Sequence, residues 1–217
     1  MKDYSKKIML LLALMMSVSY ASAKKQEPIS IIQGDPFIIQ QENKTAIYEI
    51  DYSKLIVEYG RKNDQEASFR DWMIMQNEDT EEWIKDWEEK DSAEVDKTFR
   101  ECFSDNIRKA MKLTKTGKDY KVILRLNRIN FGKESSFGKV MLFGSGAADC
   151  AIVSGEIEIL DLKTGESKLI LAFDKVAGDG QYTQMKRFRN VIDNLCNRVD
   201  EFLKSYRKQL EKEQKKK

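Results

Sequence analysis

The stretch AIVSGEIEILDLKTGESKLILAF (residues 151–173) decides the fold. Apolar residues alternate with polar ones over 153–159, and Leu169, Leu171 and Phe173 then alternate with Lys168, Ile170 and Ala172. A period of two is typical of strands with one buried face. Between these segments lies DLKTGE, in which Gly165 is placed to take a positive φ. The stretch therefore predicts a β-hairpin whose turn contains Asp161, Thr164 and Gly165.

The glycine-rich segment GSGAADC (144–150) lies directly before this hairpin. A phosphate-binding loop with Gly144 and Gly146 would need a helix after it, because free N–H groups at a helix start hold the phosphate. A strand pattern follows instead, and the spacing fits neither GxGxxG nor a P-loop. Cys150 lacks a base or cation to lower its thiol pKa, and Asp149 would raise that pKa. We expect a loop or bulge of small residues that another backbone can approach closely, with no cofactor.

Other segments indicate further strands. Tyr48, Ile50 and Tyr52 alternate with acidic residues in 45–52, and a second short strand is expected at 54–59. Residues 120–126 alternate as well, and the apolar parity then shifts toward residue 131, which indicates a bulge. Residues 24–44 contain both prolines and show little periodicity, so we expect a mobile lead-in before a single domain at 45–206.

Helical periodicity occupies the rest of that domain. A short helix is expected at 69–75, and a second begins at Asp91, with apolar residues every fourth position from Val95, and ends near 116–117. Residues 185–206 repeat apolar side chains at intervals of three and four, which predicts a final helix of roughly seven turns. Its seam suits either the face of the predicted sheet or a coiled coil with a partner or second copy, and we favour the sheet.

Together these patterns predict an α+β fold. We expect an antiparallel sheet of four to six strands, with helices on one face and a long C-terminal helix. The remaining residues, 207–217, form a basic solvated tail. The segment Lys204–Lys217 is basic enough to touch anionic lipid headgroups, a contact that would be at most peripheral.

The chain begins with features of an export signal. Basic residues precede the apolar run 8–18, which is too short to span a bilayer, and Ala-Ser-Ala at 21–23 suits a signal peptidase. No cysteine follows, so the lipoprotein pattern is missing. We predict a bacterial signal peptide at 1–23 and a periplasmic or otherwise envelope-associated protein.

Composition excludes several functions. Without residues 1–23, the 38 basic and 36 acidic residues become 35 of each, and a neutral chain gains little from counterion release on nucleic acid. The chain has no histidine, which excludes Ser-His-Asp and Cys-His catalysis and zinc sites with histidine ligands. No catalytic motif is recognisable, so we expect a protein that is not an enzyme.

Three cysteines are present: Cys102, Cys150 and Cys196. All three have apolar neighbours, and we favour small buried hydrophobic side chains. Export also permits one disulfide, which would leave one free thiol. The spacing does not suit a metal site made from all three thiolates.

Residues 119–205 resemble a group of exported bacterial envelope proteins and lipoproteins of unknown function. The matching residues are Gly144, Gly146 and Ala147 before the strand, and the turn residues 161, 164 and 165. Such proteins are similar to small α+β envelope domains related to the N-terminal domain of TolB and to curli-export assembly proteins. The resemblance implies a non-catalytic role in the envelope and carries over no catalytic residues.

The region 72–96 suggests an alternative. Trp72, Trp83 and Trp87 lie among many carboxylates, so they could form a carbohydrate platform or a carboxylate-based site of glycan hydrolysis. Aromatic residues facing the core of an acidic helix are the simpler interpretation, and the spacing of a calcium loop is absent. We therefore predict a non-catalytic envelope protein that binds a partner protein or supports assembly, with glycan binding as the alternative.

Overall fold

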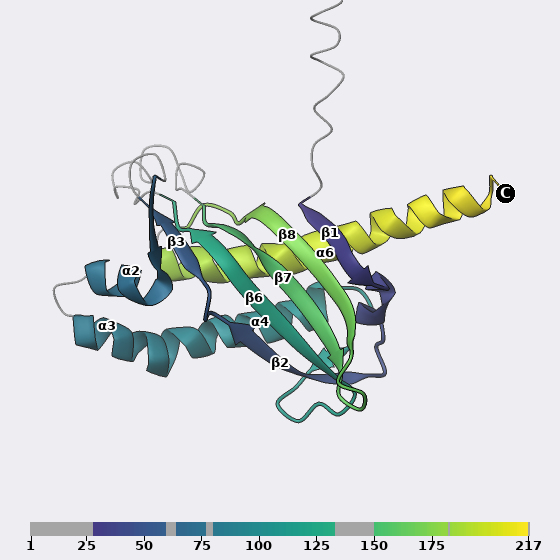
Figure 1. The fold of residues 1–217 in the computed structure, drawn as a ribbon, viewed down its shortest axis with the longest axis horizontal. Coiled ribbons are helices and arrows are strands. Elements are labelled where there is room, and N and C mark those ends of the chain that lie inside the picture. The colour runs from purple at the N-terminus through teal and green to yellow at the C-terminus, as the bar shows by residue number, and fades with distance from the viewer. Residues whose placement is uncertain (1–27, 60–63, 77–79, 133–149, 182, 217) are drawn as a thin grey trace, which may run out of the picture.

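The computed structural model describes residues 28–59, 64–76, 80–132, 150–181 and 183–216. It has an α+β fold, in which a mixed sheet of eight strands is covered by helices, the last of them long (Figure 1). The predicted fold class is confirmed. The predicted signal peptide 1–23 and the predicted loop residues Gly144 and Gly146 lie outside the described residues.

The elements follow one another in a β-rich order. The strands are β1 (Ile29–Gly34), β2 (Thr45–Asp51), β3 (Ile56–Tyr59), β4 (Gln65–Ser68), β5 (Lys112–Leu113), β6 (Tyr120–Asn130), β7 (Ile152–Asp161) and β8 (Ser167–Ala177). The helical segments are η1 (Pro36–Ile39), α2 (Phe69–Gln76), α3 (Thr80–Asp86), the π-helical turn η2 (Trp87–Asp91), α4 (Ser92–Asn106) and α6 (Gln184–Gln214).

The sheet is larger than expected and is not wholly antiparallel. Its main order is β1-β8-β7-β6-β2-β5, and β3 and β4 extend it beside the end of β6. Strands β6, β7 and β8 form an antiparallel meander, whereas β2 and β3 both pair with β6 in parallel. The chain between β2 and β6 contains α2, α3 and α4, so a long connection of this kind can join parallel strands.

The predicted hairpin is present, with the expected turn. In β7 and β8, Ile157 lies opposite Leu171. Gly165 has a φ of 71°, and its N–H donates to the carbonyl oxygen of Asp161 at 2.8 Å. The parity shift in β6 is also confirmed as a bulge, because the register against β7 slips between Leu126 and Arg128.

The expected lead-in is wrong for the residues that the structure describes. Strand β1 forms an antiparallel pair with β8, and η1 buries Ile39 in the core. A short strand with one bulge and two flanking prolines shows little periodicity, which is why the sequence pattern missed it.

Two helix boundaries differ from the predictions. Asp91 makes no side-chain cap, because η2 joins α3 directly to α4. Helix α4 ends at Asn106 instead of near residue 116. Ile107 and Met111, which continue the apolar stripe, lie in the turn segment between α4 and β5 and are both buried there.

Helix α6 covers the sheet and then extends beyond it. Thr183 caps its start by accepting a hydrogen bond from the Lys186 N–H. Its apolar seam is buried inside the protein as far as Leu203, so the preference for the sheet over a coiled coil is confirmed to that point. Helix α6 continues to Gln214 and projects past β1 (Figure 1), where a solvated tail was expected.

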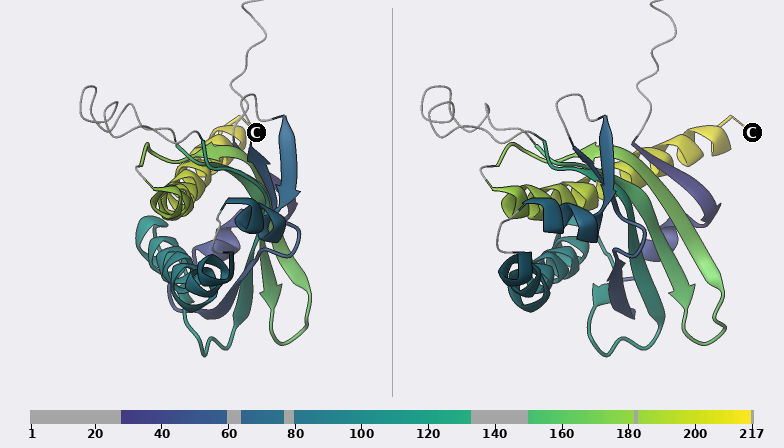
Figure 2. Two further views of the ribbon diagram at one scale, coloured as in Figure 1. Left: turned by 90° about the vertical axis from the view of Figure 1, so that its left-hand side faces the viewer. Right: turned by 60° about the vertical axis from the view of Figure 1, so that its left-hand side comes forward.

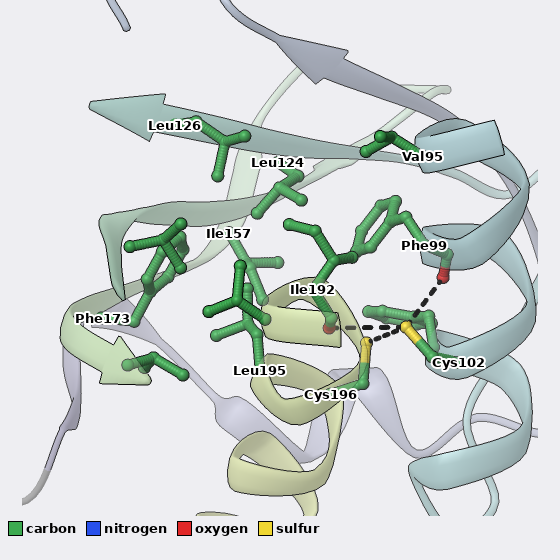
Figure 3. Close-up of a cluster of buried hydrophobic side chains, with 14 of the residues drawn as sticks. Val95, Phe99, Cys102, Leu124, Leu126, Ile157, Phe173, Ile192, Leu195 and Cys196 are labelled. Carbon is green, nitrogen blue, oxygen red and sulfur yellow. Dashed lines mark hydrogen bonds between the residues drawn. The ribbon is translucent and has the colours of Figure 1, made fainter. Parts of the chain in front are cut away.

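The core lies between the sheet and the helices. Helices α4 and α6 pack against each other along the same face of the sheet (Figure 2). Figure 3 shows the centre of this layer, where Leu124 of β6 and Ile157 of β7 meet Phe99 of α4 and Ile192 of α6. Alternate residues of the strands therefore supply one wall of the core and the helix seams supply the other.

Candidate binding cleft

A cleft of about 370 Å³ opens where the β2–β3 turn meets the helical segments α2, α3 and η2. We call it the aromatic cleft. Its exposed lining is about equally polar and apolar, because serines and one pair of opposite charges lie among aromatic and aliphatic side chains. The lining residues are Tyr52, Ser53, Leu55, Ser68, Phe69, Arg70, Met73, Ile84, Trp87 and Glu88.

Three rings form the floor of the aromatic cleft. Tyr52 and Phe69 are stacked with centroids 6.1 Å apart, and Trp87 meets them edge-on at 5.4 Å and 4.8 Å respectively. Beneath them, Trp87 stacks on Phe188 of α6 at 6.1 Å. Edge-to-face and stacked pairs of this kind stabilise a rigid arrangement, so the floor is fixed to the core.

Local hydrogen bonds set the position of α2 at the cleft. The Ser68 hydroxyl accepts the Asp71 N–H at 3.1 Å and donates to the Asp71 carboxylate at 2.6 Å, so Ser68 caps the helix. The Phe69 N–H donates to the Leu55 carbonyl oxygen at 2.9 Å and fastens the helix start to the β2–β3 turn. These bonds direct Phe69 and Met73, one helical turn apart, toward the cleft.

Trp87 reaches the cleft from a π-helical turn. Segment η2 runs from Trp87 to Asp91 and joins α3 to α4 without a break in the helical backbone. One extra residue in a turn rotates the side chains that precede it relative to those that follow. Turns of this type are rare and frequently occur at functional sites.

Helix α2, which supplies Met73 to the aromatic cleft, also carries two exposed apolar side chains. Ile74 and Met75 are 43% and 52% exposed, although both are large apolar side chains. They follow Met73 by one and two residues, so they lie on other faces of the helix and do not line the cleft. The Tyr59 hydroxyl contacts the Met75 Sδ at 3.8 Å. Methionine is adaptable and is common on surfaces that bind partner proteins, so this exposed part of α2 is suited to an apolar partner.

The Tyr52 hydroxyl is buried and has no hydrogen-bond partner among the described residues. Burial raises the pKa of the Tyr52 phenol, and the negative charge of Asp96 raises it further. Tyr48 on the preceding strand differs, because its hydroxyl donates to the Asp96 carboxylate at 2.9 Å. Tyr52 therefore stays protonated and carries an unsatisfied donor beneath the cleft.

The predicted tryptophan platform is not present as an exposed surface. Trp72 is 2% exposed and stacks on Phe131 at 4.7 Å, and Trp87 is 8% exposed. Neither ring offers a free face on which a sugar could stack, so the core-facing interpretation holds for both. The side chain of Trp83 lies outside the described residues.

The structural turn lies far from the aromatic cleft. Asp161 pairs with Tyr120 at the start of β6, whereas β3, which precedes α2, pairs with the end of β6. The Asp161 carboxylate accepts the N–H groups of Lys163 and Thr164 at 2.8 Å and 3.2 Å. These bonds lower the pKa of Asp161, the larger contribution coming from Lys163. The predicted turn residues thus have a local structural role.

Sequence reasoning identified one lining residue, Trp87, and missed the rest. Tyr52, Phe69 and Met73 were assigned to a strand and a helix by periodicity, which does not report which elements meet. One signal was present in the sequence: Phe69, Trp72, Met73 and Met75 make the segment 69–75 unusually rich in large apolar side chains for a short helix.

The described part of the chain holds no group of three or more cysteine, aspartate or glutamate side chains placed to bind a metal ion. Within the same residues, no helix is long and apolar enough to cross a membrane. A second, smaller groove of about 220 Å³ lies between the start of β1 and helix α6, lined by Ile29 and Phe202 among others.

No protein-family model matches the chain, and no curated protein matches its sequence. Among solved structures, the chain is similar in layout to a dodecamer of a PelC point variant from Paraburkholderia phytofirmans, with 7% identity, a TM-score of 0.37, and coverage of 79% of this chain and 97% of the other. A PelC dodecamer from the same organism has 8% identity, a TM-score of 0.34, and coverage of 79% and 96%. At these values the likeness carries no argument about function, and the envelope resemblance of residues 119–205 stays a prediction.

Proposed function

We propose that this chain is an exported, non-catalytic envelope protein that binds a partner protein, and that the aromatic cleft receives an apolar segment of that partner. One observation carries the proposal: a cleft with a rigid aromatic floor is lined in part by α2, the helix that also exposes Ile74 and Met75. Exposed apolar side chains that are grouped on one element next to a pocket are typical of interaction sites.

The chemistry of the cleft supports binding without catalysis. The charged residues of its lining are Arg70 and Glu88, whose charges sum to zero. The chain has no histidine, and the one perturbed group in the lining, Tyr52, is held protonated. A general acid or base needs a pKa near the working pH, and the raised pKa of Tyr52 is shifted away from that range.

The sequence supports the export part of the proposal through the predicted signal peptide 1–23. The predicted weak contact of Lys204–Lys217 with anionic headgroups is retained as part of the proposal. A second copy remains an alternative partner, since α6 projects beyond the sheet (Figure 1).

Site-specific photo-crosslinking in intact cells tests the proposal. A photoreactive residue at exposed Ile74 on α2 is compared with one at Leu162 in the β7–β8 turn, which is 40% exposed and lies at the opposite end of β6. We expect a discrete crosslinked protein from position 74 and none from position 162. The crosslinked species is identified by mass spectrometry, and its mass distinguishes another protein from a second copy.

A variant whose cleft is blocked by a bulky side chain provides a second test of the crosslinking result. Ser53→Phe at the margin places a ring in the cleft, and it is expected to abolish the crosslink at position 74 while the protein remains folded by circular dichroism. Equal crosslinking from positions 74 and 162, or a crosslink that persists unchanged in Ser53→Phe, would contradict the assignment of the cleft.

A further inference from the structure

Two cysteines from different helices meet in the core. Cys102 on α4 and Cys196 on α6 are both buried, and their Sγ atoms lie 2.6 Å apart (Figure 3). A disulfide bond spans about 2.05 Å, so only small rotations separate this contact from a covalent bond. The two positions are distant in sequence and belong to the helix pair that covers the sheet.

Apart from the Cys196 Sγ, the polar contacts of the Cys102 Sγ are with helix backbone. The Cys102 thiol contacts the carbonyl oxygens of Phe99 at 3.5 Å and of Ile192 at 3.6 Å, both of which are helix backbone. The third cysteine, Cys150, is half-buried and lies immediately before β7, in the sheet layer. The structure thus separates the three cysteines into a contacting pair and a single residue.

We infer that Cys102 and Cys196 are joined by a disulfide in the exported protein and that Cys150 remains a free thiol. The inference rests on the export part of the proposed function, because disulfides persist in oxidising compartments and not in the cytosol. The odd number of cysteines, which left the pairing open in the sequence, is accounted for by this assignment.

The oxidation balances as a thiol–disulfide exchange. The Cys102 thiolate attacks the disulfide of a protein disulfide oxidant and forms a mixed disulfide, which releases one oxidant thiolate. The Cys196 thiolate then attacks the Cys102 Sγ, which forms the Cys102–Cys196 bond and releases the second oxidant thiolate. Two electrons pass to the oxidant, and the two protons from the cysteine thiols protonate its dithiol.

The bond forms before the helices finish packing. Burial raises the pKa of the Cys196 thiol well above its usual value, and the neighbouring Cys102 raises it further. The thiolate is the reacting species, so a packed core supplies neither the thiolate nor access for the oxidant. Once formed, the bond is protected from reductants by the same burial.

The disulfide links α4 to α6, the two helices that pack together on the sheet. The chain between the two cysteines contains β5, β6, β7 and β8, so the bond closes a long loop. Closing a long loop restricts the unfolded chain strongly. The two helices that cover the sheet are therefore held together without altering the solvent-facing surface.

Alkylation and intact-mass analysis test the inference on the full chain, expressed with its own N-terminal segment and recovered from the envelope fraction. When the chain is denatured without reductant, one thiol, at Cys150, is expected to react with iodoacetamide. Before alkylation, the mass of the chain should lie about 2 Da below that of the same chain after reduction. Three reactive thiols under these conditions would overturn the inference. Peptide mapping would also overturn it by finding a bridge that includes Cys150.

A comparison of unfolding midpoints with and without reductant distinguishes a disulfide from two cysteines that only pack together. Reduction of the denatured chain, followed by refolding and unfolding in reductant, is expected to lower the unfolding midpoint of the wild type, and of Cys150→Ala, by about 10 °C. Cys102→Ala lacks the bond, so its midpoint should not respond to reductant, whatever its absolute value. An equal response to reductant in Cys102→Ala and Cys150→Ala would contradict the inference.

Cell fractionation of the same samples keeps the two proposals distinguishable. A chain that is found outside the cytosol with three free thiols overturns the disulfide and leaves the partner-binding proposal intact. A chain that stays in the cytosol contradicts the export on which both depend. A bridged chain without a crosslink at position 74 supports the disulfide and contradicts the cleft.

Discussion

The ring of Phe173 on β8 lies directly over Gly155 on β7. A Cβ atom at position 155 would come 2.8 Å from the Phe173 Cζ and 2.1 Å from the carbonyl oxygen of Arg125 on β6. The carbonyl belongs to the ladder between β6 and β7, so it cannot move without loss of the pairing. Overpacking of this kind costs about 1–3 kcal/mol, and we expect Gly155→Ala to lower the free energy of unfolding by about 2 kcal/mol in urea denaturation.

Gly165 supplies the control for that substitution. It has a φ of 71°, and no neighbouring atom lies within 4 Å of the point that a Cβ would occupy, so only its backbone conformation restricts the side chain. Asparagine tolerates this region, and Gly165→Asn is expected to change the free energy of unfolding by less than about 0.5 kcal/mol. Equal losses for the two variants would show that crowding by Phe173 and Arg125 is not the cause.

Asp161 makes stability depend on pH. Its pKa is lowered below the ordinary value of about 3.8 by the N–H groups of Lys163 and Thr164. A lowered pKa in the folded state means that the ionised carboxylate stabilises the fold above the unfolded pKa, and that this contribution is lost as pH falls through the folded pKa. We expect the free energy of unfolding of the wild type, measured between pH 7 and pH 2, to contain this acid-dependent loss.

Asp161→Asn isolates the charge from the hydrogen bonds. The asparagine side-chain oxygen can still accept both N–H groups, but it does not titrate. The difference in the free energy of unfolding between wild type and Asp161→Asn should therefore shrink as pH falls from 5 to 2. A difference that stays constant or grows over this range would contradict the assigned role of the carboxylate.

The hairpin and the final helix were predictable because their signals are local. A period of two over residues 153–159 and a glycine at 165 fix strand and turn without reference to other elements. The bulge in β6 was visible as a change of parity within one strand. The seam of α6 was similarly continuous in sequence, so its burial followed once a sheet was predicted beside it.

The parallel pairings and the cleft were not predictable in this way. Strand β2 could have paired with several partners, and its parallel register on β6 depends on how the intervening helices pack. Tyr52, Phe69 and Trp87 come together through that same packing. The π-helical turn also rotates Trp87 relative to a regular helix, which a pattern of 3.6 residues per turn does not anticipate.

Two tyrosines, one on β2 and one in the turn after it, are expected to respond oppositely to loss of the hydroxyl. The Tyr52 hydroxyl is buried without a partner among the described residues, so Tyr52→Phe removes an unsatisfied donor and should raise the free energy of unfolding by about 1 kcal/mol. The Tyr48 hydroxyl donates to Asp96, so Tyr48→Phe should lower that free energy by about 1 kcal/mol. Denaturation of both variants at pH 7 gives the signs directly, and a loss for both would contradict the description of Tyr52.

The projecting end of α6 should be dispensable for stability beyond one anchoring contact. The Tyr206 ring lies 5.9 Å from Phe37 and 5.8 Å from Phe202, and the Arg207 guanidinium lies 5.0 Å above the Phe37 ring. The segment 208–216 that follows is almost wholly exposed. Truncation after Lys208 should therefore change the free energy of unfolding by less than about 0.5 kcal/mol.

Tyr206→Ala is the matched variant within the full-length helix. It removes both ring contacts and should lower the free energy of unfolding by about 1 kcal/mol, because aromatic pairs contribute on that order. Urea denaturation of the two variants beside the wild type measures the contrast. If the truncation cost as much as Tyr206→Ala, residues beyond 208 would have to stabilise the fold, and a role for that segment in binding alone would be contradicted.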